Sequence, residues 1–185
     1  KADLQADNSD WVIAFWHHPP YTKGSHDSDT ESNLIDMRQN FLPVLEAHGV
    51  DLVLGGHSHS FERSYLLDGH YGTSSTFSSA YQIDAGDGRT DGTGAYTKSA
   101  GSIPLEGAVY SVVGSSGQTS GGSLNHPAMF ISLNEAGSMV LDIDGQTLNA
   151  KFISSSGVVR DHFTITKPGA PTSCGLPWGG TIGDG

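Results

Sequence analysis

Two apolar runs that flank one amphipathic segment dominate the first third of the chain. The runs are "WVIAFW" (11–16) and "VDLVLGG" (50–56), and the segment "NLIDMRQNFLPVLEAHG" (33–49) between them has apolar residues at helical spacing. A continuous apolar run is typical of a central parallel strand covered on both faces. The order strand, helix, strand therefore predicts a right-handed βαβ unit with parallel strands. Pro43, inside the helical segment, is expected to kink it or to begin a new turn.

From Phe61 onward the pattern changes to short apolar runs separated by Gly, Ser, Asn and Asp residues. These runs predict antiparallel strands and hairpins, and they are "FERSYLL" (61–67), "GAVYSVVG" (107–114), "AMFISL" (128–133), "SMVLDIDG" (138–145), "TLNAKFIS" (147–154) and "VVRDHFTIT" (158–166). The segment 86–102 is polar and rich in glycine, which predicts a loop. Residues 168–185 have the Pro and Gly content of a linker, or of the start of a further module.

Composition and charge argue against several kinds of partner. The chain has 185 residues, enough for one domain with a core, and its formal net charge of −11 argues against nucleic acid or an anionic membrane. No run of apolar residues is long enough to predict a membrane span. The single Cys174 provides neither a disulfide framework nor a cysteine zinc site. Few lysines and many Ser, Thr, Gly and Asp residues suggest a secreted bacterial protein, extracellular or periplasmic.

Histidines follow both predicted parallel strands. The segment "HHPPY" (17–21) comes after the first strand and "GHSH" (56–59) after the second. Function gathers at the carboxyl ends of such strands, where we expect His17, His57 and His59 to converge. Neutral imidazole is a ligand for zinc, iron and manganese ions. A lone histidine is more often a packed or surface residue, and we interpret four others in this way: His48, His70, His126 and His162.

Three stretches carry a family resemblance: "WVIAFWHHPPYTKGSH" (11–26), "GVDLVLGGHSHSFERS" (49–64) and "GAVYSVVGSSG" (107–117). With them the chain resembles the C-terminal half of a calcineurin-like metallophosphoesterase, closest to the purple acid phosphatase branch. The resemblance implies an α/β (α+β) fold, a four-layer α/β/β/α sandwich. Residues 1–167 would form its C-terminal half, with one βαβ unit followed by antiparallel strands.

The resemblance also implies site residues. In this family two metal ions, divalent or trivalent (Fe, Zn or Mn), lie a few ångströms apart. Carried over, His17 and His57 would ligate one ion and His59 the other. His26 would contact the substrate phosphate and protonate the leaving alcohol, a role worth about 10² to 10⁴ in rate; the alternative is an exposed loop histidine. Residues expected in the substrate pocket or in support of the ligands are His18, Tyr21, Glu62 and Arg63.

The implied activity is the metal-dependent hydrolysis of phosphate esters, as in an acid phosphatase that acts on small phosphomonoesters. A metal-activated water at a dinuclear centre needs no side-chain nucleophile, and the chain has neither a nucleophile elbow nor a Walker loop. Beside the histidine pair, Glu62 and Arg63 are expected to form a buried ion pair that supports the loop.

The family's remaining ligands come from an N-terminal half, whose Asp, Gly-Asp-x-x-Tyr and Gly-Asn-His segments are not found in this sequence. We therefore expect a piece of a longer chain that holds part of the site and is inactive when isolated. Its partner would be the missing N-terminal half of the same domain. Without that half, the apolar run 11–16 is expected to present an unpaired edge.

Two alternative functions remain open, and a third is disfavoured. A phosphodiesterase or nucleotidase of the same superfamily would use the same ligands. A non-catalytic, β-rich binding module would pack its histidines inside a sandwich, but this does not explain why two histidine segments follow two strands. A metallo-β-lactamase-like hydrolase needs an Asp soon after its His-x-His pair, whereas the next one here is Asp68.

Overall fold

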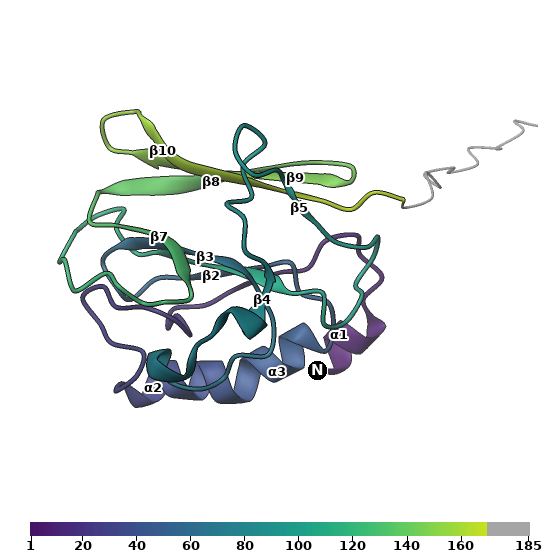
Figure 1. Ribbon diagram of the computed structural model, residues 1–185, viewed down its shortest axis with the longest axis horizontal. Helices are drawn as coiled ribbons and strands as arrows, with labels where there is room; N and C mark the ends of the chain where they lie inside the picture. The colour runs from purple at the N-terminus through teal and green to yellow at the C-terminus, as the bar shows by residue number, and fades with distance from the viewer. Residues whose placement is uncertain (170–185) are drawn as a thin grey trace, which may run out of the picture.

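The structure, a computed structural model, describes residues 1–169 and arranges them in three layers (Figure 1). Short helices cover one face of a six-stranded sheet, and a four-stranded sheet packs on its other face. The first sheet has the order β1 (Ile13–Phe15), β2 (Leu52–Gly55), β6 (Ala108–Val113), β3 (Phe61–Leu67) and β4 (Gln82–Asp84), with β7 (Met129–Leu133) also paired to β3. The second has the order β5 (Tyr96–Thr97), β10 (Val159–Thr166), β9 (Thr147–Ser154) and β8 (Gly137–Asp144).

The predicted α/β fold class is confirmed, and the predicted βαβ unit is present. β1 and β2 are parallel, with Ile13 opposite Leu52. The chain between them forms α2 (Ser32–Asp36), η1 (Met37–Phe41) and α3 (Leu42–Glu46). η1 is a π-helical turn, and it comes directly before α3, which has Pro43 in its first turn. Proline lacks an N–H and crowds the preceding turn of a regular α-helix, so the wider turn accommodates it.

Three further helices are short: α1 (Ala2–Ala6), η2 (Ser74–Thr76) and η3 (Ser79–Tyr81). Within residues 1–169, none of the helices has the length and apolar character needed to cross a membrane. The predicted linker at the C-terminus lies outside the described residues from residue 170 onward.

The runs predicted as strands after Phe61 all form strands, with one difference in direction. β8, β9 and β10 form an antiparallel meander, and β3 is antiparallel to β4, β6 and β7. β6, however, is also parallel to β2. It lies between β2 and β3, which run in opposite directions, so it must be parallel to one of them. The parallel part of the sheet is therefore one strand wider than the sequence pattern predicted.

Apolar clusters fill both spaces between the layers. Under the helices, Leu42 and Leu45 pack with Val53. Between the two sheets, the buried residues are Leu52, Leu66, Tyr96, Val109, Leu148, Ala150, Phe163 and Ile165. A fully buried side chain of this kind contributes roughly 1.5–3 kcal/mol. The first sheet is thus held from both faces, which fixes the positions of the strand ends.

β1 lies at an edge of the first sheet. Its only partner among the described residues is β2, and the Phe15 side chain is 80% exposed. The expectation of a central strand covered on both faces is therefore wrong for residues 1–169. The expected unpaired apolar edge is what the structure contains instead.

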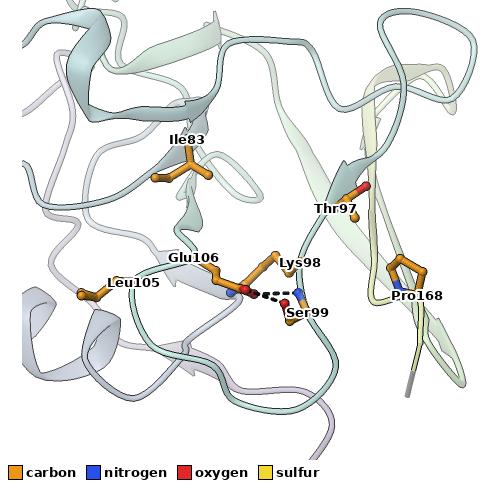
Figure 2. A pocket seen from close by; sticks show the side chains of 7 residues that line it. All are labelled: Ile83, Thr97, Lys98, Ser99, Leu105, Glu106 and Pro168. Atoms are coloured by element: carbon orange, nitrogen blue, oxygen red, sulfur yellow. Dashed lines mark hydrogen bonds between the residues drawn. The ribbon is translucent and has the colours of Figure 1, made fainter. Parts of the chain in front are cut away.

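The segment predicted as a polar loop, 86–102, is anchored at its C-terminal end. It includes β5, and Lys98 is buried with its Nζ 2.8 Å from Asp51 Oδ1. A hollow of about 360 Å³ lies beside it, and Figure 2 shows the side chains that line it. Its lining residues are Ile83, Thr97, Lys98, Ser99, Leu105, Glu106 and Pro168. Asp51 immediately precedes β2, so this hollow lies at the opposite end of that strand from the histidine segments.

Candidate metal centre

The histidine segments are held side by side at the carboxyl ends of β1 and β2. Gly56 N donates a hydrogen bond to His17 O at 3.0 Å, which continues the pairing of the two strands. Gly55 has no side chain at a point where an added Cβ would lie 2.9 Å from Pro19. The segment "HHPPY" therefore packs directly onto the end of β2.

His17 and His57 face each other across this junction. His17 Nε2 lies 3.0 Å from His57 Nδ1. The ring of His18 is 4.9 Å from that of His17 and 4.7 Å from that of His57, between centroids. Each of the three offers a ring nitrogen within 4.8 Å of the others. Nitrogen ligands that bind one zinc ion at about 2.0–2.1 Å are themselves roughly 3 Å apart. The His17 and His57 nitrogens thus fit a shared metal ion.

The backbone and the protonation state of His57 also suit a ligand. Its φ of 59° lies in the left-handed region, which is uncommon for a residue other than glycine and is often retained at functional sites. Burial lowers the pKa of the ring, and this outweighs the raising effect of Glu31; the nearby histidines lower the pKa further. A lower pKa favours the neutral imidazole, which is the form that binds metal.

His57 belongs to a second cluster as well, with His26 and Glu31. Glu31 Oε1 lies 2.9 Å from His26 Nδ1, and Glu31 Oε2 lies 3.4 Å from His57 Nε2. The two rings are 3.7 Å apart between centroids. Ring nitrogens and a carboxylate oxygen of this cluster lie within 4.8 Å of one another. His57 therefore directs one nitrogen toward each cluster and joins the two.

Glu31 was missed by the sequence analysis. It directly precedes α2, and its Oε1 accepts a hydrogen bond from Asp27 N at 3.1 Å. Burial alone would raise the pKa of Glu31, but this bond and those from His26 and His57 lower it, so the carboxylate is ionised. An acidic residue at the start of a helix is ordinarily interpreted as a helix-start signal. The available clue was its place in the same loop as His26.

His59 lies apart from both clusters within the described residues. Its Nδ1 is 2.9 Å from Ser120 Oγ, and its backbone N–H donates to Ser25 Oγ at 2.9 Å. The assignment of His59 as a ligand to a second ion stays a prediction.

Tyr21, in the segment that follows β1, is buried in the core cluster under the helices. It is 1% exposed, its hydroxyl donates to His70 O, and its ring packs edge-on against Tyr110 at 5.1 Å between centroids. Of the two roles expected for Tyr21, its burial fits support of the ligands better than a place in the substrate pocket, and the assignment stays a prediction. The apolar body of tyrosine gains more from burial in this cluster than from exposure beside the histidines.

Glu62 and Arg63 do not form the expected ion pair with each other, because neighbouring residues on a strand point to opposite faces. Arg63 points between the sheets, where its Nε and Nη2 donate to Asp161 at 2.5 and 2.9 Å. Glu62 points toward the site loop and accepts hydrogen bonds from Thr22 Oγ1, from Ser60 Oγ at 2.9 Å and from Lys23 N at 3.3 Å. Glu62 alone therefore supports the loop that leads to His26.

Part of this chain, including the site, is similar to a known family. Residues 2–61 match the family model of the calcineurin-like phosphoesterases. This range includes both clusters and His59. Two uncharacterised proteins of Mycobacterium tuberculosis are 39% identical over 64 residues, which is 35% of this chain and 12% of theirs. Purple acid phosphatase 3 of Arabidopsis thaliana is 34% identical over 58 residues, 31% of this chain and 14% of that protein.

Solved structures share the fold over most of the chain. A purple acid phosphatase from yellow lupin (Lupinus luteus) seeds matches with a TM-score of 0.62 and 19% identity, over 89% of this chain and 27% of that one. A Plasmodium protein described as the anchor in the inner membrane complex matches with a TM-score of 0.57 and 16% identity, over 92% of this chain and 41% of that one. The matched part of this chain spans about an eighth of the length of the curated relatives.

Proposed function

We propose that this chain, a calcineurin-like phosphoesterase of the purple acid phosphatase branch, forms part of a metal-dependent enzyme that hydrolyses small phosphate monoesters. The observation that carries the proposal is the 3.0 Å approach of His17 Nε2 and His57 Nδ1 at the ends of two paired parallel strands. Two nitrogens from segments forty residues apart are brought to a spacing that suits one metal ion.

Two ions (Fe, Zn or Mn) suit the imidazole and carboxylate groups gathered here. His17 and His57 would hold one ion, and His59 the other. When bound, such ions supply positive charge that neutralises phosphoryl oxygens and lowers the pKa of a coordinated water. His18 lies near enough to His17 and His57 to contact a substrate oxygen or to orient a ligand.

His26 and Glu31 would handle the proton of the leaving alcohol. The Glu31 carboxylate holds His26 Nδ1 at 2.9 Å, which fixes the orientation of the ring. The other ring nitrogen, Nε2, would then donate a proton to the departing alkoxide. Glu62 keeps this loop in place through Thr22 and Lys23.

The remaining ligands would come from a further part of the same domain. The free edge of β1, with the exposed Phe15 beside it, can accept a neighbouring strand. We propose that this strand belongs to the N-terminal half of the domain. The low lysine content and abundance of Ser, Thr and Gly support a secreted location, extracellular or periplasmic, in a bacterium.

The test is metal analysis and hydrolysis of an aryl phosphate by the protein that contains this chain. We expect two metal ions and turnover in the wild type, and loss of both in His17→Ala and His57→Ala. His162→Ala is the matched control, because His162 lies on β10 and pairs with the exposed Asp91. A folded wild-type protein that holds no metal and hydrolyses no ester would instead indicate a binding module. Preference for a diester or a nucleotide over a monoester would revise the substrate class.

A further inference from the structure

Ser120 bonds to His59 in two ways. Its hydroxyl oxygen lies 2.9 Å from His59 Nδ1, and its backbone N–H donates to His59 O at 3.2 Å. The backbone N–H of His59 is in turn held by Ser25 Oγ at 2.9 Å. The ring and both backbone polar groups of His59 are thus engaged, so its orientation is set by these two serines.

Ser120 is itself held in place by the segment that carries it, residues 115–125. Leu124 N donates to Lys23 O at 2.8 Å, and Gly121 N donates to Asn134 Oδ1 at 3.0 Å. Gly122 packs so closely on the site loop that an added Cβ would lie 1.8 Å from Gly24 O. The segment is therefore bound to the loop before His26 on one side and to the end of β7 on the other.

The chemistry of the pair depends on which nitrogen of His59 carries the proton. Gln118 Nε2 donates to Ser120 Oγ at 3.3 Å, so this oxygen already acts as an acceptor. A hydroxyl oxygen has two lone pairs, and the second is available for Nδ1–H of His59. A histidine that donates from one nitrogen to an oxygen presents the other, unprotonated, as a ligand.

We propose that Ser120 is a positioning residue for His59: its hydroxyl accepts Nδ1–H and leaves Nε2 as the metal-binding atom. This role rests on the proposed function, in which His59 is a ligand. The hydrogen bond itself, however, can be measured without any metal.

The first experiment determines the tautomer of His59 by ¹⁵N imidazole NMR of the metal-free protein at about pH 8, above the ordinary pKa of imidazole. We expect the Nδ1–H form in the wild type and in Ser120→Thr, which keeps the hydroxyl. Ser120→Ala is expected to shift His59 toward the Nε2–H form. The matched control is Ser123→Ala, because Ser123 lies in the same segment and bonds to Lys23 O and Asn125 instead. Wild-type His59 in the Nε2–H form would overturn the proposal.

The second experiment measures Zn²⁺ affinity by competition with a chelator. Loss of a partner that orients a metal ligand typically weakens metal binding by about 10- to 100-fold. We expect this loss in Ser120→Ala, with recovery in Ser120→Thr and no change in Ser123→Ala. Equal affinity in Ser120→Ala and the wild type would contradict the positioning role. A wild-type protein with the Nδ1–H tautomer that binds no Zn²⁺ would reject the proposed function and the ligand role of Nε2, while the Ser120 hydrogen bond would stand.

Discussion

His57 Nδ1 lies 3.0 Å from His17 Nε2, while the other nitrogen of the same ring lies 3.4 Å from Glu31 Oε2. One imidazole thus joins two groups of potential ligands. The arrangement depends on the parallel pairing of β1 and β2 and on the left-handed backbone at His57. It makes His57 the residue whose loss should disturb the site most.

We predict that His57→Ala lowers Zn²⁺ affinity by about a hundredfold or more, because it removes a direct ligand rather than a supporting group. His18→Ala should cost less, since His18 lies within ligand reach of only one cluster. Competition with a chelator measures both. His48→Ala serves as the control, because His48 lies just after α3 and bonds to Val44 O of that helix. A His57→Ala protein that binds Zn²⁺ as tightly as the control would refute the shared-ligand interpretation.

Glu31→Gln should slow hydrolysis in a way that depends on the leaving group. The substitution keeps the size of the side chain but removes the carboxylate charge that lies beside His26 Nδ1. Alkyl phosphates need a proton donor more than aryl phosphates with acidic leaving groups. We expect kcat to fall by about 10- to 100-fold for alkyl phosphates and by much less for 4-nitrophenyl phosphate, given the usual worth of general acid catalysis. An equal fall in kcat for both substrates would show that Glu31 does not act through proton donation by His26.

The sequence predicted the part of the site that depends on strand order, and missed the part that depends on how loops fold. His17 and His57 directly follow two strands, and parallel pairing brings them together whatever the loops do. Glu31 lies beside His57 only because the loop after Lys23 folds back toward the histidines before α2 begins. No hydrophobic periodicity in the sequence predicts the conformation of this loop. The Glu62 and Arg63 pair was mispredicted because proximity in sequence was given more weight than the alternation of side chains along a strand.

The same distinction applies to the fold. Apolar runs identified the strands, because strands buried between layers need apolar side chains. Pro43 indicated that the regular α-helix is interrupted near this residue. The parallel pairing of β6 with β2 could not be predicted from the residues of β6, since it follows from the position of β6 between β2 and β3. The anchoring of segment 86–102 depends on the ion pair between Lys98 and the buried Asp51. These residues are far apart in the sequence, so the polar, glycine-rich composition of the segment does not predict the contact.

Protonation of His126 should make folding less favourable in acid. Burial lowers its pKa to about 3 in the folded protein, whereas the unfolded value is about 6.5. Between these two values the unfolded chain binds a proton that the folded protein does not. The contribution of His126 to the free energy of unfolding is therefore fully present above about pH 6.5. It is lost as pH falls toward 3, by at most about 1.4 kcal/mol per pH unit.

Urea unfolding at pH 7, 6 and 5 measures this effect. His126→Asn keeps an acceptor for Ala128 N, the partner of His126 Nδ1, and should reduce the loss of stability between pH 6 and pH 5 by about 1 kcal/mol. His162→Asn is the control, because His162 is partly exposed on β10 and pairs with Asp91, and it should leave the slope near that of the wild type. An unchanged slope in His126→Asn would mean that this ring is already protonated in the folded protein at pH 5.

Two neighbours on β10 provide a matched test of buried against exposed ion pairs. Asp161 is 2% exposed and accepts from Arg63 and from Arg89 Nη2 at 2.8 Å. Asp161→Asn leaves the buried Arg63 charge unpaired, a change that costs about 3–5 kcal/mol in comparable pairs. Arg160→Ala removes only the pair with Glu135 at the surface, worth about 0.2–1 kcal/mol. We therefore predict a large loss in the free energy of unfolding for Asp161→Asn and a small one for Arg160→Ala, both measured by urea unfolding at pH 7. Similar small losses in the two variants would show that water reaches Arg63 and that this pair does not hold the sheets together.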